Sequence, residues 1–190
     1  MQQIYLDNAA TTPVRPEVEE VMQPYFCEKY GNPSGIYKMA SECRQALETV
    51  RKQIGKTLKV SAEEIYFTSG GTESDNWAIK STAQRLKEKG KHIITSKIEH
   101  HAVLNSCAYL ETQGFEVTYL DVDEWGCVRF DALQRAIRKD TILISIMYAN
   151  NEVGTIQPIG QIGKIAKEND IFFHTDAVQA YGQIPIEVKR

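Results

Sequence analysis

Short apolar runs alternate along the chain with stretches of helical periodicity, and this alternation constrains the fold more than any other feature of the sequence. The runs expected to form strands are residues 64–68, 92–96, 116–122, 141–149 and 171–175. They are rich in Ile, Val, Tyr and Phe and apolar on both faces, which is typical of strands buried in a parallel sheet. The alternation predicts an α/β fold with a doubly wound, mostly parallel sheet and right-handed crossovers.

The stretches around these runs carry apolar residues at helical spacing. One stripe extends from Val18 to Phe26, where Pro24 is expected to kink or end the helix, and another extends from Ala40 to Ile54. Further helices are expected at residues 72–89, 102–112, 131–139 and 159–168. In such a fold, ligands bind beyond the carboxyl ends of the strands, so the residues that follow each strand are the candidates for a functional site.

Composition narrows the class of protein. The 190 residues include 22 Lys and Arg against 25 Asp and Glu, which excludes the strong basic bias of a typical nucleic-acid binder. The longest mainly apolar run, residues 142–149, is far shorter than the roughly 20 residues that cross a bilayer, and the first residues do not form a secretory signal. The four cysteines are widely spaced, which predicts a reduced, cytoplasmic protein without a structural zinc site.

A glycine pair lies between the first expected strand and the helix that follows it, in the sequence Ser69-Gly70-Gly71-Thr72. Glycines let the backbone approach an anion, and the first N–H groups of a helix carry the positive end of its dipole. The segment matches neither a Walker A loop nor the GxGxxG fingerprint. Two interpretations stay open from these residues alone: a phosphate cradle, or a tight turn with an N-cap and a capping-box-like acid.

Polar side chains also follow the later strands. His100 and His101, after residues 92–96, could stack on an aromatic ligand or move a proton, or could only decorate a helix start. Asn151, after residues 141–149, could hold a ligand oxygen or shape a turn. Asp176, after residues 171–175, could pair with a protonated pyridine nitrogen or cap the next segment. Taken together, these strand ends meet the needs of one cofactor, pyridoxal 5′-phosphate.

Six stretches carry a resemblance to a known family: Tyr5-Leu6-Asp7-Asn8-Ala9-Ala10-Thr11-Thr12-Pro13, Tyr30-Gly31-Asn32-Pro33-Ser34, Phe67-Thr68-Ser69-Gly70-Gly71-Thr72-Glu73-Ser74-Asp75-Asn76, Glu99-His100-His101-Ala102-Val103-Leu104, Ala149-Asn150-Asn151-Glu152-Val153-Gly154-Thr155-Ile156-Gln157-Pro158 and His174-Thr175-Asp176-Ala177-Val178-Gln179. The chain resembles the N-terminal half of a NifS/IscS-type cysteine desulfurase. These enzymes belong to the class V aminotransferase group of fold-type I pyridoxal phosphate enzymes. The stretches occur in family order over essentially the whole chain, and residues 150–154 are similar to the NifS/IscS branch rather than the SufS branch.

The resemblance implies a role for each candidate residue. Gly71 and Thr72 would bind the cofactor phosphate, and His100 would stack on the pyridine ring and act as a catalytic acid and base. Asn151 would contact the ring hydroxyl and the substrate, and Asp176 would pair with the pyridinium nitrogen. The remaining implied contact is a bond from Gln179 to the ring hydroxyl. No metal site is implied.

The resemblance also implies an activity and partners. Family members convert cysteine to alanine, and the sulfur passes through an enzyme persulfide to a sulfur acceptor or scaffold protein for iron–sulfur cluster or thio-cofactor assembly. The expected protein is a cytoplasmic homodimer that binds neither a membrane nor nucleic acid directly. Two alternatives stay open: a non-catalytic interaction module or half of a split enzyme, and a selenocysteine lyase or another class V aminotransferase activity.

The sequence departs from the family pattern in two respects. Tyr37 stands where a His commonly follows the Gly-Asn-Pro-Ser stretch. The family's Schiff-base lysine, its nucleophilic cysteine and its C-terminal small domain lie beyond the position equivalent to Arg190. The expected organisation is an N-terminal segment over residues 1–15 and a partial large domain over residues 16–190, incomplete at its C-terminal side. On this basis the 190-residue chain alone is expected to be inactive.

Overall fold

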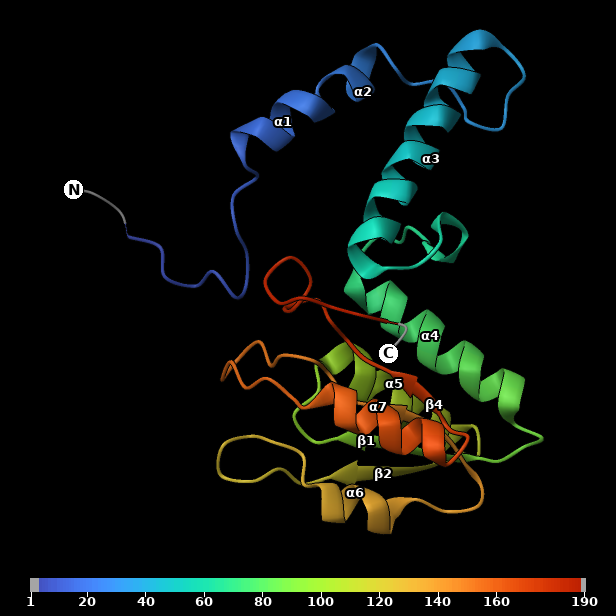
Figure 1. The fold of residues 1–190 in the computed structure, drawn as a ribbon, viewed down its shortest axis with the longest axis vertical. Coiled ribbons are helices and arrows are strands. Elements are labelled where there is room, and N and C mark those ends of the chain that lie inside the picture. Colours follow the sequence, from blue (N-terminus) through green and yellow to red (C-terminus); the bar gives the residue numbers. More distant parts are fainter. Residues whose placement is uncertain (1–3, 189–190) are drawn as a thin grey trace. The chain divides into compact units, whose positions relative to one another are not determined.

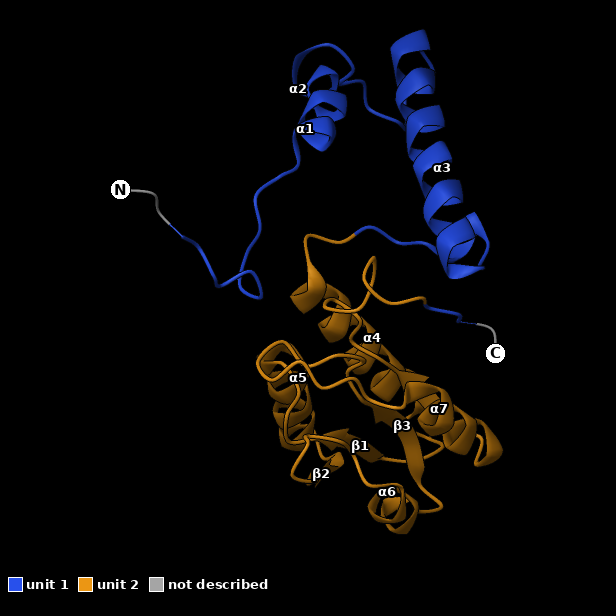
Figure 2. Ribbon diagram, turned by 60° about the vertical axis from the view of Figure 1, so that its left-hand side comes forward, with its two compact units in different colours: residues 1–67, 186–190 blue, residues 68–185 orange. Residues whose placement is uncertain are grey.

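The computed structural model describes residues 4–188. The chain divides into two compact units (Figure 2). One unit comprises the residues up to Phe67 together with the segment from Ile186, and the other is Thr68–Pro185. The division expected from the sequence, at residue 15, stays a prediction.

The unit Thr68–Pro185 is built on a parallel sheet. Its strands are β1 (His92–Ser96), β2 (Glu116–Leu120), β3 (Thr141–Ser145) and β4 (Phe172–His174), in the order β2-β1-β3-β4 (Figure 1). All three pairings are parallel; for example, Ile94 pairs with Thr118 on one side and with Ile144 on the other. The predicted α/β class with a parallel sheet is confirmed.

Helices cover both faces of this sheet, because consecutive strand residues point to opposite sides. Ile93 and Leu143 pack with residues of α4 (Gly71–Leu86) and α5 (His101–Thr112). Ile94 and Ile144 pack with residues of α6 (Phe130–Ala136) and α7 (Ile159–Glu168). Figure 2 shows the strands between the two groups of helices. The central strands β1 and β3 are buried along their whole length, as expected of a doubly wound sheet, whereas the outer strands β2 and β4 are partly exposed.

The predicted strand at residues 64–68 is wrong, because the described backbone is not a strand there. Instead, the 3-10 helix η1 (Ala62–Glu64) is closed by a capping box, in which the Glu64 carboxylate accepts bonds from the Ser61 N–H at 2.8 Å and the Ser61 hydroxyl at 2.9 Å. This local interaction competes with an extended conformation. Tyr66 and Phe67 remain exposed, so no sheet buries the apolar side chains that suggested a strand.

The predicted strand at residues 141–149 is too long, since its regular part ends at Ser145. The chain beyond it still contacts the segment after β4. The Ile146 N–H donates to the His174 carbonyl at 3.1 Å, and the Tyr148 N–H donates to the Asp176 carbonyl at 2.8 Å. These two bonds hold the loops after β3 and β4 side by side, so both are fixed in position where a ligand would bind.

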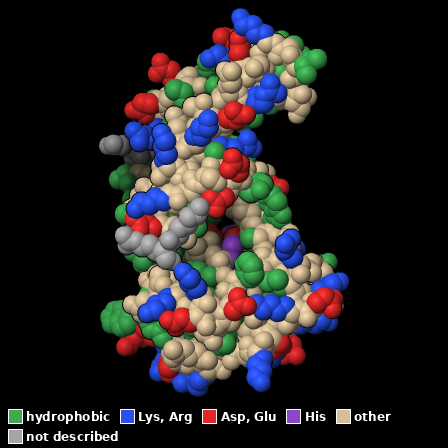
Figure 3. Space-filling view, turned by 45° about the vertical axis from the view of Figure 1, so that its right-hand side comes forward, with side chains coloured by type: hydrophobic (Ala, Val, Ile, Leu, Met, Phe, Trp, Pro, Cys, Tyr) green, Lys and Arg blue, Asp and Glu red, His purple; other side chains and the backbone are tan. Residues whose placement is uncertain are grey.

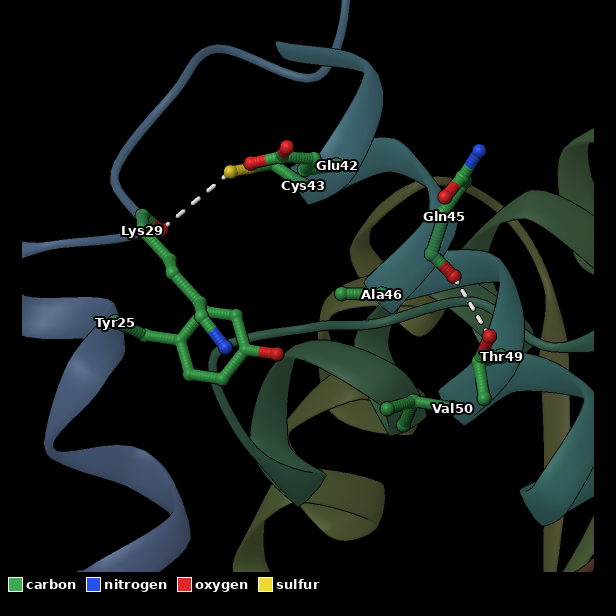
Figure 4. Close-up of a pocket in the computed structure, with 8 residues that line it drawn as sticks. All are labelled: Tyr25, Lys29, Glu42, Cys43, Gln45, Ala46, Thr49 and Val50. Carbon is green, nitrogen blue, oxygen red and sulfur yellow. Dashed lines mark hydrogen bonds between the residues drawn. The ribbon is translucent and has the colours of Figure 1, made fainter. Parts of the chain in front are cut away.

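The other unit is helical and contains α1 (Pro16–Met22), α2 (Pro24–Cys27) and α3 (Lys38–Leu58). The predicted break at Pro24 is confirmed. Figure 4 shows a hollow between Tyr25 and Lys29 on one side and α3 on the other, where the Cys43 thiol donates to the Lys29 carbonyl at 3.4 Å. Within residues 4–188, no helix is both long and apolar enough to span a membrane.

Candidate functional site

The candidate site lies at the carboxyl ends of the strands in the unit Thr68–Pro185. In the sheet, β2 lies next to β1 on one side, whereas β3 and then β4 lie on the other side of β1. The direction of winding therefore reverses between β1 and β3, and such a switch point is where ligands bind in open α/β sheets. Strands β1, β3 and β4 end at Ser96, Ser145 and His174, and the loops that follow them lie at this switch point.

The N-terminus of α4 presents hydrogen-bond donors. Gly70 is the N-cap, and the first intrahelical bond is donated by the Ser74 N–H to the Gly70 carbonyl at 3.2 Å. The N–H groups of Gly71, Thr72 and Glu73 precede that bond and form the donor end of a 16-residue helix. An anion is stabilised at such an end.

The capping-box-like acid of the alternative interpretation is present as well, although Gly70, the N-cap of α4, makes no side-chain cap bond. The Glu73 carboxylate accepts bonds from the Ser69 N–H and the Ser69 hydroxyl, both at 2.7 Å, and these bonds lower the pKa of Glu73. The Thr68 hydroxyl donates to the Gly70 carbonyl at 3.1 Å. These side chains act on the turn that precedes the helix, so the turn is fixed while the donor end of α4 is retained.

Gly71 is in close contact with the segment after β4. A Cβ atom added at Gly71 would lie 2.7 Å from Cγ2 of Val178, so only glycine fits without displacing that side chain. The Val178 N–H in turn donates to Oδ1 of Asp176 at 2.9 Å. The residues predicted for the phosphate end and the nitrogen end of the cofactor are thus brought to neighbouring segments through Val178.

Asp176 is a buried carboxylate, only 8% exposed, and the bond from Val178 makes it the first residue of a turn. No Lys or Arg within residues 4–188 forms an ion pair with it. The adjacent Thr175 hydroxyl oxygen is buried and has no hydrogen-bond partner in the part of the chain that the structure covers. A buried acid beside an unpartnered hydroxyl suits a polar or cationic ligand, because desolvation is otherwise uncompensated.

The three other predicted residues lie in the loops at the same edge. His100 is exposed and is the N-cap of α5, where its Nδ1 accepts the Ala102 N–H at 3.1 Å. Asn151 is half-buried and donates to Glu152 Oε1 at 2.7 Å. Gln179 is half-buried in the turn after Asp176. In a neutral His100 ring the proton lies on Nε2, since Nδ1 accepts a bond.

Sequence reasoning missed Glu99, which ties β1 to β3. Its carboxylate is 5% exposed, accepts the Ser96 hydroxyl at 2.6 Å, and accepts the Met147 N–H at 3.0 Å from each oxygen. Burial raises the pKa of Glu99 to about 7. Asn150 adds a second tie, donating to the Ile98 carbonyl at 2.8 Å. The bonds of Glu99 and of Asn150 fix the loops that carry His100 and Asn151.

Sequence reasoning also missed a buried acid and imidazole beside Asp176. Oδ1 of Asp75, on α4, lies 3.6 Å from Nε2 of His174, and Nδ1 of His174 lies 2.9 Å from the Ser145 hydroxyl. Burial, with a second contribution from the charge of Asp176, raises the pKa of Asp75 to about 7. Burial also lowers the pKa of His174 to about 4. In the sequence, only the apolar residues before His174 indicated that this histidine is buried.

Comparison with known proteins gives a consistent family. The family model described as "Aminotransferase class-V" matches residues 4–190. The cysteine desulfurase IscS of Methanosarcina thermophila is 64% identical over 98% of this chain and 46% of its own length, and that of Dictyoglomus turgidum is 60% identical over 98% and 48%. The chain thus spans about half the length of the curated relatives it matches.

Solved structures show the same fold. A NifS-like protein superposes with a TM-score of 0.96 at 43% identity, covering 100% of this chain and 52% of that one. The structure titled "SspA in complex with cysteine" superposes with a TM-score of 0.93 at 44% identity, covering 97% and 53%. The cysteine desulfurase of Thermococcus onnurineus gives a TM-score of 0.90 at 28% identity, covering 98% and 46%.

Proposed function

The chain belongs to the class V aminotransferase family, and from this premise we propose that the protein is a pyridoxal 5′-phosphate-dependent cysteine desulfurase whose cofactor is bound at the strand ends of Thr68–Pro185. Relatives that are 64% and 60% identical carry the name cysteine desulfurase IscS. A structural neighbour holds cysteine, which supports cysteine as the substrate. The observation that carries the proposal is the contact of Gly71 with Val178, because it joins the donor end of α4 to the turn of Asp176.

The residues present fit this cofactor. The N–H groups of Gly71 and Thr72, with the Thr72 hydroxyl, would hold the phosphate, and the buried Asp176 carboxylate would hold the ring nitrogen. Thr175 offers a buried hydroxyl that lacks a partner among residues 4–188. When bound, pyridoxal phosphate supplies an electron sink for chemistry at the substrate's α-carbon.

Each remaining side chain has a distinct task in the proposal. Asp176 keeps a proton on the ring nitrogen by pairing with it, and Gln179 and Asn151 orient the ring through its hydroxyl. His100 covers the ring and moves a proton at Nε2, since its Nδ1 is already bonded to the Ala102 N–H. Asn151 also contacts the bound cysteine. The sulfur then passes to an acceptor or scaffold protein, and the protein acts as a cytoplasmic homodimer.

The face of the molecule in Figure 3 shows no basic patch of the kind that binds nucleic acid. On the face seen in Figure 3, the Lys and Arg side chains are interspersed with Asp and Glu rather than gathered into one patch. This distribution agrees with 22 basic against 25 acidic residues. A small-molecule reaction at the strand ends therefore remains the better supported function.

Gly71→Ala is expected to weaken the binding of pyridoxal 5′-phosphate about tenfold or more, because the added methyl group overpacks against Cγ2 of Val178. The double variant Gly71→Ala, Val178→Ala removes the clashing atom and should recover most of the affinity. Fluorescence titration measures both. Equal affinity of Gly71→Ala and the unsubstituted chain would contradict the contact.

The activity is tested on the full-length protein, because this chain spans about half the length of its relatives and is expected to be inactive alone. Pyridoxal 5′-phosphate and L-cysteine are supplied, and alanine and sulfide are measured. The proposal predicts the two products in equal amounts when a reductant is present. Selenocysteine, offered in parallel, tests the lyase alternative. Absence of alanine from the full-length protein with the cofactor bound would contradict the desulfurase assignment while leaving the binding site intact.

A further inference from the structure

Asn150 closes the loop that carries Asn151. It lies in the segment after β3 and is only 7% exposed. Its backbone N–H donates to the Thr155 carbonyl at 2.9 Å, and its own carbonyl accepts the Gly154 N–H at 3.1 Å. Residues 151–154 therefore leave and return at one buried residue, and their position depends on how that residue is held.

The side chain of Asn150 shapes this loop from within. Its Oδ1 accepts the N–H groups of Glu152 and Val153, both at 2.9 Å. An asparagine side chain that bonds to the backbone two residues ahead forms an Asx turn, which fixes the residue in between. That residue is Asn151, so Asn150 sets the direction in which the Asn151 side chain leaves the backbone.

The same side chain joins this loop to the loop after β1. Its Nδ2 donates to the Ile98 carbonyl at 2.8 Å and to Sδ of Met147 at 3.4 Å. In the reverse direction, the Glu99 carboxylate accepts the Met147 N–H at 3.0 Å with each oxygen. Each loop thus places one buried side chain on the backbone of the other, and these two side chains directly precede Asn151 and His100.

The Asn150 amide has no hydrogen-bonding position left for a ligand. An asparagine side chain offers two N–H donors and an oxygen with two lone pairs. The donors go to the loop after β1 and to Met147, and the lone pairs accept two N–H groups of its own loop. A buried polar network that is fully satisfied holds its members rigidly. Asn150 therefore acts on the site through the residue that follows it.

We propose that Asn150 is a positioning residue for the desulfurase reaction, which holds the Asn151 amide in register with His100; this role rests on the proposed function. A misplacement of about 1 Å in such a contact lowers a rate by up to about 100-fold. The phosphate and the ring nitrogen are assigned to the α4 N-terminus and Asp176, and none of the bonds of Asn150 goes to either. Loss of the tie to Ile98 should therefore lower turnover while the cofactor is retained.

The variant Asn150→Asp separates the tie from the turn. It keeps an oxygen for the two N–H groups of its own loop but has no N–H group for the Ile98 carbonyl. Asn169→Asp is the matched control, because the Asn169 amide also donates to a backbone carbonyl, that of Ile165, at 2.8 Å. Asn169 lies at the C-terminus of α7 and precedes β4, so it is not at the strand ends that form the site.

The first measurement needs no ligand and uses ¹⁵N NMR relaxation on the 190-residue chain. The order parameter of the Asn151 backbone N–H is expected to fall from about 0.85 to about 0.6 or less in Asn150→Asp. It should stay near about 0.85 in Asn169→Asp. Equal values in Asn150→Asp and the unsubstituted chain would overturn the inference, because the tie would then not hold Asn151 in place.

The second measurement is kcat/KM for L-cysteine in the full-length protein with pyridoxal 5′-phosphate bound. Asn150→Asp and the smaller, uncharged Asn150→Ser should each lower kcat/KM about tenfold or more, with the absorbance of the bound cofactor retained. In an Asn151→Ala background, either change should lower kcat/KM by less than about twofold, because the residue through which Asn150 acts is already gone. A general loss of structure would lower the activity in both backgrounds.

Each other outcome is decisive. A further tenfold loss in the Asn151→Ala background, as an order of magnitude, would overturn the inference. Loss of the cofactor from both Asn150 variants would also overturn it, since Asn150 would then support the whole site. An unsubstituted full-length protein that makes no alanine would count against the proposed function, whereas the order parameters still decide whether Asn150 holds Asn151.

Discussion

Asp176→Asn is expected to weaken the binding of pyridoxal 5′-phosphate by about 10- to 100-fold. A hydrogen bond to a charged partner contributes roughly 1.5–3 kcal/mol, and asparagine removes the negative charge that pairs with the ring nitrogen. The variant keeps an oxygen that can accept the Val178 N–H, so the turn after β4 should be retained. The loss should therefore appear in cofactor affinity rather than in folding.

Asp121→Asn is the matched control for this experiment. Asp121 also follows a strand, β2, but it is exposed and pairs with Lys97 at 2.6 Å on the surface. Exposed ion pairs contribute little, so this variant should bind the cofactor with the affinity of the unsubstituted chain. An affinity of Asp176→Asn within a factor of about two of that control would contradict the assignment of Asp176, since it corresponds to well under 1 kcal/mol.

Glu99→Ala is expected to reduce the free energy of unfolding at pH 5 by about 2–4 kcal/mol. The substitution deprives the buried Met147 N–H and Ser96 hydroxyl of their acceptor and opens a space between the loops after β1 and β3. Urea denaturation measures the difference. A loss below about 0.5 kcal/mol, the size of an ordinary surface substitution, would show that the bridge contributes little.

Glu99→Gln separates the shape of this side chain from its titration. The pKa of Glu99 in the folded protein is raised to about 7 from an ordinary value of 4.5. Between pH 4.5 and pH 7, Glu99 is therefore protonated in the folded protein and ionised in the unfolded chain. Stability should therefore fall as the pH rises from 4.5 to about 7, by up to about 3 kcal/mol from this group. Glu99→Gln should flatten this part of the profile. An unchanged profile would contradict the raised pKa.

Elements with strong local periodicity were predictable from the sequence. The strand His92–Ser96 and the helix Ile159–Glu168 have the predicted bounds. The strand is rich in β-branched residues and buried throughout, and the helix carries a complete amphipathic pattern. The segment 64–68 was mispredicted for a local reason as well. Glu64 uses its carboxylate in a capping box with Ser61, and this polar interaction is invisible to a search for apolar runs.

Candidate site residues could be chosen from the sequence only where a glycine or a strand end marks them. Gly71 and Asp176 stand directly at the transitions between elements, so their positions follow from the α/β pattern. Glu99 was missed because its partner Met147 is 48 residues away, and Asp75 was missed because it meets His174 only in the folded sheet. Such contacts depend on the strand order β2-β1-β3-β4, which the periodicity of the sequence does not contain.

The most direct test of the central claim is a crystal structure of the chain with pyridoxal 5′-phosphate. The account predicts that the phosphate lies within hydrogen-bonding distance of the Gly71 and Thr72 N–H groups, with the ring nitrogen against the carboxylate of Asp176. A cofactor bound elsewhere in the unit Thr68–Pro185, or one whose phosphate lies at Asp176, would contradict it.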